Sequence, residues 1–378
     1  MKYQLLGKSG LRVSEICLGA MTFGEEWGWG STKEESHKIF NAYVDAGGNF
    51  IDTANKYTEG TSEKYIGEFI ADDRDRFVLA TKYTSNTKRG DPNAGGNQRK
   101  NMMQSLEASL KRLNTDYIDL YWVHAWDPLT PIEETIRSLD DMVRAGKVLY
   151  IGISDAPAWI VSQANTLANL RGWTEFKGLQ IEYSLIERTP ERELLPMANA
   201  LDIGVTAWSP LGGGVLTGKY NKSNNKQRQQ QNTSISSSSS NTTVTKEGNS
   251  HRLESQNEMA NKFLNDRNIL IAKEVSKIAK EIGYSASQVA LNWIRQQNLI
   301  ESHGKNKIIP IIGSRKESQI KDNLACLEFK LTEEQMKMLN EVSKIELGFP
   351  NDFLNSEAIK DFVYGGTYSS IHKTHTMR

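Results

Sequence analysis

Short apolar runs alternate with longer amphipathic segments along most of this chain. The runs are rich in β-branched and aromatic residues and are bounded by turn residues, which predicts β-strands. The longer segments carry apolar residues three and four positions apart, which predicts helices. The predicted strands are 15–18, 49–52, 77–82, 118–124, 149–154, 178–183, 204–208 and 308–312. The predicted helices include 33–46, 62–70, 98–113, 132–145, 157–169, 192–201 and 271–282.

Eight strands that alternate with helices favour an α/β fold of the (β/α)8 type, the TIM barrel. An open, doubly wound sheet has the same alternation and stays an alternative on the pattern alone. No Gly-x-Gly-x-x-Gly follows the first strand, which counts against the dinucleotide-binding form of that sheet. Residues 2–5 and 11–13 flank a glycine-containing turn and predict an N-terminal β-hairpin.

The 378 residues can form one barrel of about 250 residues with additional elements. We predict a barrel domain over 1–345 and a C-terminal tail over 346–378. Within the barrel, residues 221–252 are a low-complexity stretch rich in Ser, Asn and Gln. Such a stretch buries too little apolar surface to offset its ordering entropy, so we predict a disordered insertion. On the composition alone it can be a tolerated surface insertion without function.

Four polar residues lie at or just after the carboxyl ends of predicted strands: Asp52, Tyr57, Lys82 and His124. In a parallel barrel these ends converge on one mouth, so residues far apart in the sequence become neighbours. Each residue alone has an ordinary explanation. The tyrosine could be a packing residue, the aspartate a helix cap, the lysine a solvated strand end and the histidine a hydrogen-bonded core residue. The combination is what indicates a site.

The chemistry of carbonyl reduction requires such a group. Hydride that reaches a carbonyl carbon leaves negative charge on the oxygen, and a positioned acid must neutralise it. Tyr57 is the predicted acid, and a nearby cation is needed because a free tyrosine titrates near ~10. Lys82 is the candidate cation, Asp52 its counter-ion, and His124 a group that orients the substrate oxygen.

Several ordered motifs carry a resemblance to a known family. They are residues 18–24, 50–54 with Tyr57, 110–124, 146–154, 180–184, 208–214 and 308–323. With these motifs the chain resembles the aldo-keto reductases, and most closely their larger-chain branches, which include potassium-channel β subunits and bacterial stress proteins. The resemblance runs over residues 5–342 and is interrupted near 221–265. It implies that the N-terminal hairpin closes the barrel floor. It also implies that the region after the seventh strand folds partly over a bound cofactor, so the insertion 221–252 could alternatively loosen that cover.

The resemblance also implies roles for the site residues. Tyr57 is expected to be the general acid. The expected cofactor is NADP(H), whose reduced form, NADPH, would lie extended across the mouth. The nicotinamide carboxamide is expected to bind Ser154, Asp155 and Gln180, and the nicotinamide ring to stack on Tyr183. The family more often has Asn where this chain has Asp155, and a carboxylate can accept from the amide but cannot donate to it.

Two loops are predicted to bind the cofactor's phosphates. The loop after the seventh strand offers small residues whose backbone amides can approach a pyrophosphate, although an ordinary glycine-rich turn looks the same. After the eighth strand, Gly313, Ser314, Arg315 and Lys316 open a helix and would favour a 2′-phosphate, hence NADP over NAD; a solvated basic turn is the alternative. By resemblance, Gln319 and Asn323 contact the adenine. The first loop's predicted contacts are Trp208, Ser209, Pro210, Leu211, Gly213, Gly218 and Lys219.

Aromatic residues near the expected mouth suggest a pocket for a small aldehyde or ketone, although part of them are expected simply to pack. They are Phe23, Trp27, Trp29, Tyr83 and Trp126.

Composition excludes several other classes. With 46 basic and 46 acidic residues and no basic stripe, nucleic acid is not an expected partner. Two distant cysteines suggest neither a zinc site nor a disulfide framework, so no metal is expected. No signal segment and no apolar run of about 18 residues is present, so we expect a cytoplasmic protein without membrane insertion. The sequence does not indicate an oligomeric state.

Together these features predict an enzyme that uses NADPH to reduce small aldehydes or ketones reversibly to alcohols. The main alternative is a cofactor-binding, redox-sensing subunit of the channel-β type, since such subunits can retain the same four residues. A scaffold without activity would require the four residues to coincide by accident.

Overall fold

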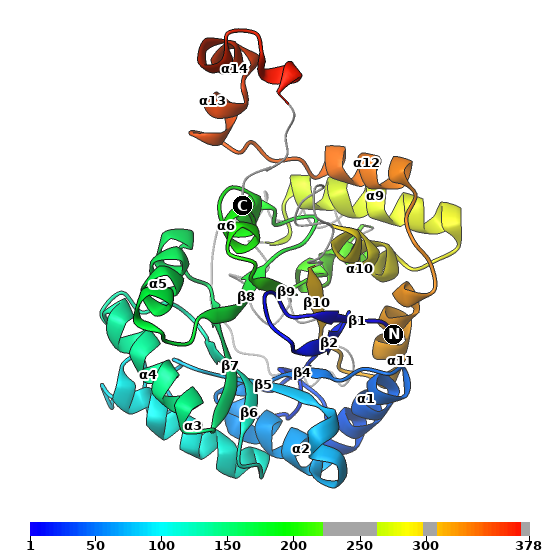
Figure 1. The fold of residues 1–378 in the computed structure, drawn as a ribbon. Helices are drawn as coiled ribbons and strands as arrows, with labels where there is room; N and C mark the ends of the chain where they lie inside the picture. The colour runs from blue at the N-terminus through cyan, green and yellow to red at the C-terminus, as the bar shows by residue number, and fades with distance from the viewer. Residues whose placement is uncertain (222–262, 298–307, 372–378) are drawn as a thin grey trace, which may run out of the picture.

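The computed structural model describes residues 1–221, 263–297 and 308–371. The predicted TIM barrel is confirmed, because eight parallel strands close on themselves in the order β10-β3-β4-β5-β6-β7-β8-β9 (Figure 1). The open-sheet alternative is therefore wrong. The barrel strands are β3 Cys17–Gly19, β4 Phe50–Asp52, β5 Val78–Tyr83, β6 Ile118–Val123, β7 Val148–Ser154, β8 Phe176–Glu182, β9 Gly204–Trp208 and β10 Ile309–Ile312.

Helices surround the barrel, and several begin at a residue whose side chain caps the first turn. Thr32 accepts from the backbone N–H of Glu35, and Ser285 forms a reciprocal capping box with Gln288. The helices are α1 Lys33–Asp45, α2 Thr61–Phe69, α3 Arg99–Leu113, α4 Ile132–Arg144, α5 Ala158–Arg171, α6 Leu194–Ala200, α9 Asp266–Ile282, α10 Ala286–Gln296, α11 Glu317–Leu324 and α12 Glu333–Val342.

Successive residues of each strand point to opposite sides of the barrel wall. On β6, Leu120 and Trp122 belong to the inner cluster, whereas Tyr121 and Val123 belong to the outer core beneath the helices. Trp122 fills the interior closely: a Cβ at Gly152 would lie 2.3 Å from its ring. The inner and outer faces of the strands thus decide which side chains can reach the mouth.

The predicted hairpin is present as β1 Tyr3–Leu5 and β2 Arg12–Ser14, which pair in antiparallel fashion. Leu6 and Val13 pack into the inner cluster of the barrel. The backbone N–H of Lys8 donates to the carbonyl of Asp202, 2.6 Å away, just before β9 begins. The hairpin therefore covers the amino-terminal end of the barrel and leaves the carboxyl ends of the strands as the mouth.

Two predicted segments, the insertion 221–252 and the C-terminal tail 346–378, lie partly outside the described residues. Of the proposed insertion 221–252, only Asn221 is described; its side-chain amide donates to the Ser276 hydroxyl, 2.9 Å away. Beyond α12, the short helices α13 Asn351–Asn355 and α14 Glu357–Tyr364 stand away from the barrel (Figure 1). Within the described ranges, no helix is long and apolar enough to span a bilayer.

Candidate active site

Lys82 brings three of the four predicted residues together. It points into the barrel from β5 and is fully buried. Its ammonium forms an ion pair with Asp52 of β4 and donates to the hydroxyl of Tyr57 at 3.1 Å and to the carbonyl of Thr53 at 2.9 Å. Three donors thus meet three acceptors, which is the complete capacity of an ammonium group. Asp52 also accepts from the Gln180 amide at 3.1 Å, so β8 contributes to the same cluster.

Burial and charge set the protonation of this cluster. Burial alone would lower the pKa of Lys82, but the Asp52 carboxylate and Tyr57 more than offset it, and the pKa is raised. Burial also raises the pKa of Tyr57, while the Lys82 ammonium acts against that increase. At neutral pH the phenol is therefore protonated and touches a cation that stabilises its conjugate base. This arrangement can donate a proton to an oxygen that gains charge.

His124 lies beside the phenol. Its ring stands edge-on to that of Tyr57, with centroids 5.6 Å apart. The backbone N–H of His124 donates to the Thr84 hydroxyl at 3.2 Å, and its Nδ1 lies 3.5 Å from the Ser85 hydroxyl. Burial, assisted by the Lys82 charge, lowers the pKa of His124 to about 3. The imidazole is therefore neutral across the physiological range and can form hydrogen bonds without acting as a cationic acid.

The lowered pKa of His124 predicts an acid-side loss of stability. In the unfolded chain the imidazole binds a proton below pH 6.5, whereas in the folded chain it does so only near pH 3. Between these values the unfolded state gains protons, so stability falls as pH falls. From pH 7 to pH 5 the wild type should lose up to about 2 kcal/mol more than a His124→Gln variant. Urea unfolding of both proteins at each pH measures this, and equal losses would contradict it.

Residues from β7 and β9 complete the mouth. Ser154 ends β7 and is buried, and Asp155 follows in a left-handed conformation with φ of 47°. The carboxylate of Asp155 accepts from the indole N–H of Trp208 at 3.1 Å. Trp208 is the inward-facing last residue of β9 and is only partly buried. It is therefore an aromatic face at the mouth, a feature that the sequence assigned only to phosphate binding.

Tyr183 does not have the position that stacking on a ring at the mouth requires, so this prediction is wrong. It follows Leu179 and Ile181 on the outer side of β8, is 1% exposed, and stacks on Trp293 with centroids 5.4 Å apart. Its hydroxyl lies 2.8 Å from Glu191. No ring face of Tyr183 is left free for a ligand.

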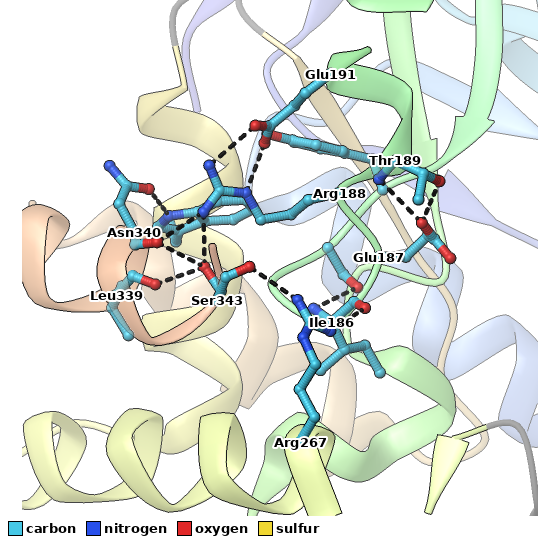
Figure 2. A network of polar contacts seen from close by, with 12 residues as sticks. Ile186, Glu187, Arg188, Thr189, Glu191, Arg267, Leu339, Asn340 and Ser343 are labelled. Atoms are coloured by element: carbon cyan, nitrogen blue, oxygen red, sulfur yellow. Dashed lines mark hydrogen bonds and ion pairs between the residues drawn. The ribbon is translucent and has the colours of Figure 1, made fainter. Parts of the chain in front are cut away.

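Figure 2 shows the network that holds Glu191. Arg188 contacts both carboxylate oxygens, at 2.7 and 2.9 Å, and reaches Ser343 at the end of α12. Arg267 of α9 donates to the carbonyl of Ser343 at 2.8 Å and to that of Ile186 at 3.0 Å. The loop after β8 is thus fixed to α9 and α12, and Tyr183 is held in its outer position.

The glycine-rich loop after β9 has a backbone conformation that glycine favours. Gly212, Gly213 and Gly214 have φ of 54°, 61° and 92°, a conformation that side chains disfavour. Two amides of the loop are already occupied by Ser209. The Gly212 amide donates to the Ser209 carbonyl at 2.8 Å, and the Gly213 amide donates to the Ser209 hydroxyl at 3.3 Å. Lys219 is exposed and its ammonium lies 4.8 Å from the Tyr220 ring. A phosphate that binds these amides would have to replace their hydrogen bonds to Ser209.

The segment after β10 is tied to the loop after β3. Thr22 donates to the carbonyl of Ser314 at 2.6 Å, and Ser31 donates to that of Arg315 at 3.1 Å. The Ser314 hydroxyl is buried and has no hydrogen-bond partner among the described residues, as expected of an atom that a ligand satisfies. The amide of Arg315 donates to Gln319 at 2.9 Å, so this glutamine caps the turn.

Two further observations qualify the predicted phosphate site after β10. The amide of Glu317, at the start of α11, donates to the Glu35 carboxylate at 2.6 Å, so one helix-start donor is occupied by a protein group. Asn323 lies at the other end of α11 and is buried. The side chains of Arg315 and Lys316 therefore have to supply most of any preference for a 2′-phosphate. Among the described residues, no group of acidic, histidine or cysteine side chains could hold a metal ion.

The predicted aromatic rim is only partly present. Phe23 and Tyr83 are fully buried in the outer core, where Tyr83 stacks on Tyr121, so they are packing residues. Trp27 remains partly exposed, and its ring lies edge-on to Tyr57 with centroids 6.4 Å apart. Trp29 packs against Trp27 at 5.6 Å. The loop after β3 therefore supplies aromatic side chains near Tyr57, whereas Trp126 is partly buried against the outer core.

Comparison with known proteins agrees with this geometry. The sequence model of the Aldo/keto reductase family matches residues 15–344. A putative aryl-alcohol dehydrogenase of Saccharomyces cerevisiae is 33% identical over 94% of this chain and 90% of the relative. An aryl-alcohol dehydrogenase [NADP(+)] of Phanerodontia chrysosporium is 34% identical over 98% and 91%, and a norsolorinic acid reductase of Emericella nidulans is 35% identical over 92% and 82%. The chain belongs to the aldo/keto reductase family and is an oxidoreductase that interconverts carbonyls and alcohols.

Proposed function

We propose that this chain reduces small aldehydes or ketones with NADPH and oxidises the corresponding alcohols with NADP. The observation that carries the proposal is the Lys82 ammonium, which contacts the Asp52 carboxylate and the Tyr57 hydroxyl at once. A buried cation bonded to a protonated phenol is the arrangement that proton donation to a developing alkoxide requires.

Ser154, Gln180 and Trp208 would hold the nicotinamide of a bound cofactor, which would supply the hydride that the carbonyl carbon receives. Tyr57 donates its proton to the carbonyl oxygen, and the Lys82 ammonium stabilises the phenolate that remains. Asp52 keeps Lys82 charged despite its burial, and the neutral His124 donates a hydrogen bond that orients the oxygen. In the reverse direction the phenolate takes the proton from the alcohol. The ion pair between Lys82 and Asp52 stays intact in both directions of the reaction.

The residues of the mouth suit a nicotinamide dinucleotide. Ser154, the last residue of β7, and Gln180, two residues before the end of β8 at Glu182, are polar groups that can bind a carboxamide. Trp208 replaces Tyr183 as the aromatic face for the nicotinamide ring, since its indole is partly exposed and its N–H is fixed by Asp155. The glycine backbone at 212–214 suits the pyrophosphate, and the buried Ser314 hydroxyl lacks a hydrogen-bond partner within the described part of the chain.

Aromatic aldehydes are the substrate class that we favour. Trp27 lies beside Tyr57 and packs against Trp29, and an aromatic ring can stack edge-on or offset against such groups. The relatives described above are named for aryl alcohols and for norsolorinic acid. These enzyme names also give no support to a channel-type subunit. Oxidation of NADPH by the isolated chain with benzaldehyde tests the function, and tight NADPH binding without turnover would favour the sensing subunit instead.

Preference for NADP is expected to depend on Arg315. An Arg315→Gln variant should bind NADPH about tenfold to a hundredfold more weakly, because it loses charge-assisted bonds to the 2′-phosphate. Affinity for NADH, which lacks this phosphate, should be unchanged. Quenching of protein fluorescence measures both dissociation constants. Arg171→Gln, an exposed change on α5, is the matched control. Equal weakening of both cofactors would contradict this role.

A further inference from the structure

The backbone after Tyr57 adopts an unusual conformation. Thr58, Glu59 and Gly60 are left-handed in succession, with φ of 45°, 55° and 92°. Glycine adopts this conformation freely, but a β-branched residue such as threonine rarely does. The local preference of the sequence therefore opposes the turn, and contacts elsewhere must hold it. Strain of this kind gathers at functional sites.

The side chain of Thr58 supplies those contacts. It is fully buried, and its hydroxyl donates to the carbonyl of Phe23 at 2.5 Å while accepting from the amide of Ser62 at 3.1 Å. Gly24 packs directly against it, since a Cβ there would lie 2.8 Å from the Thr58 side chain. One hydroxyl thus joins the loop after β3 to the start of α2 across the turn.

Neighbouring contacts reinforce the same connection. The Ser62 hydroxyl donates to the carbonyl of Ala20 at 2.7 Å, and the indole N–H of Trp27 donates to Glu59 at 3.1 Å. Among the described residues, only Lys82 holds the Tyr57 hydroxyl, while the ring stands edge-on to Trp27 and His124. The direction of the phenol therefore depends strongly on the backbone that carries it.

We propose that Thr58 is a positioning residue, whose buried hydroxyl holds the left-handed turn against the loop after β3 and so keeps the Tyr57 phenol within reach of Lys82 and the substrate oxygen. The inference rests on the proposed function. Thr58 does not touch the reacting atoms. It acts through the chain direction at Tyr57, and a methyl group of the same size cannot replace its donor and acceptor.

Three substitutions at position 58 separate this role from simple stability. Thr58→Val keeps the shape and removes the hydroxyl, and we expect kcat to fall about tenfold or more, with KM and NADPH affinity changed less than about twofold. Thr58→Ser keeps the hydroxyl and should retain kcat within about threefold. Thr58→Gly suits the left-handed backbone, so it should fold, yet it should lose kcat as Val does.

The pH profile gives a second readout. A phenol that moves away from the Lys82 ammonium loses the influence that lowers its pKa, so the basic limb of kcat should move to higher pH in Thr58→Val and Thr58→Gly. Thr81→Val is the matched control, because Thr81 is equally buried and donates to Glu63 at 2.6 Å on the outer side of β5. It should lose stability but keep the wild-type kcat and pH limb.

Outcomes at this position are distinguishable from failure of the proposed function. An active wild type with Thr58→Gly at wild-type kcat and pH dependence would overturn the positioning role alone. Loss of kcat in Thr58→Ser equal to that in Thr58→Val would also overturn it, since shape rather than the hydroxyl would then matter. A wild type that turns over no carbonyl would overturn the proposed function and this inference together.

Discussion

Replacing Tyr57 by Phe is expected to lower kcat for aldehyde reduction by about 10²–10⁴-fold, the usual contribution of a positioned general acid. The phenol is the group that both contacts Lys82 and lies beside His124. Phe keeps the ring and its edge-on packing, so NADPH affinity should change less than about twofold. Steady-state kinetics and fluorescence titration of the same preparation measure the two effects.

The control for this substitution is Tyr117→Phe. Tyr117 also donates from its hydroxyl to a carboxylate, that of Asp75 at 2.8 Å, but it lies before β6 at the floor of the barrel. It should keep wild-type kcat. A Tyr57→Phe enzyme that retains more than about a tenth of wild-type kcat would mean that another group donates the proton.

Replacing Lys82 by Met should damage both stability and activity. Asp52 would remain as a buried carboxylate without its cation, which typically lowers the free energy of unfolding by about 3–5 kcal/mol. The phenolate would also lose its stabilising charge, so kcat should fall by roughly a hundredfold or more. Chemical denaturation and kinetics on the folded protein measure the two losses separately.

A double variant distinguishes these two effects. Asp52→Asn combined with Lys82→Met removes both charges, so most of the stability should return while activity stays low. Arg74→Met is the control, because it removes the cation that contacts buried Asp119 at 2.7 Å, far from the mouth. It should lower stability without changing kcat. Recovery of activity in the double variant would contradict the role of the ion pair.

Convergence of the strands' carboxyl ends on one mouth made most of the site predictable. Asp52 and Lys82 lie on the inner sides of β4 and β5, and the closed barrel brings them together as expected. Alternation along the strands, which that prediction did not use, identifies the error at Tyr183. It shares a side with Leu179 and Ile181, whereas Gln180 faces inward. The inner aromatic residue at the mouth is Trp208, and strand parity in the sequence is sufficient to find it.

Some helices missed from the sequence carried a readable signal. Helices α10 and α12 both begin with capping boxes, Ser285 with Gln288 and Thr332 with Gln335. Their apolar residues also recur at helical spacing, so the sequence contained both signals for these helices. The predicted helix 271–282 likewise begins earlier, at Asp266, because Asn265 caps it.

The turn at Thr58 could not be predicted from the sequence. Threonine prefers extended backbone, and the left-handed conformation here depends on a hydrogen bond to Phe23, 35 residues away. The lowered pKa of His124 has the same origin, since it follows from burial and from Lys82 rather than from adjacent residues. Tertiary contacts decide both features, and local patterns do not contain them.

Transfer of deuterium from NADPH to the product tests the central claim most directly. NADPH doubly deuterated at the C4 position of its nicotinamide is incubated with the isolated protein and benzaldehyde, and the alcohol is analysed by mass spectrometry. We predict benzyl alcohol with one deuterium on the carbinol carbon and a proton from Tyr57 or solvent on the oxygen. Tight binding of NADPH without labelled alcohol would contradict the assignment of this chain as a carbonyl reductase.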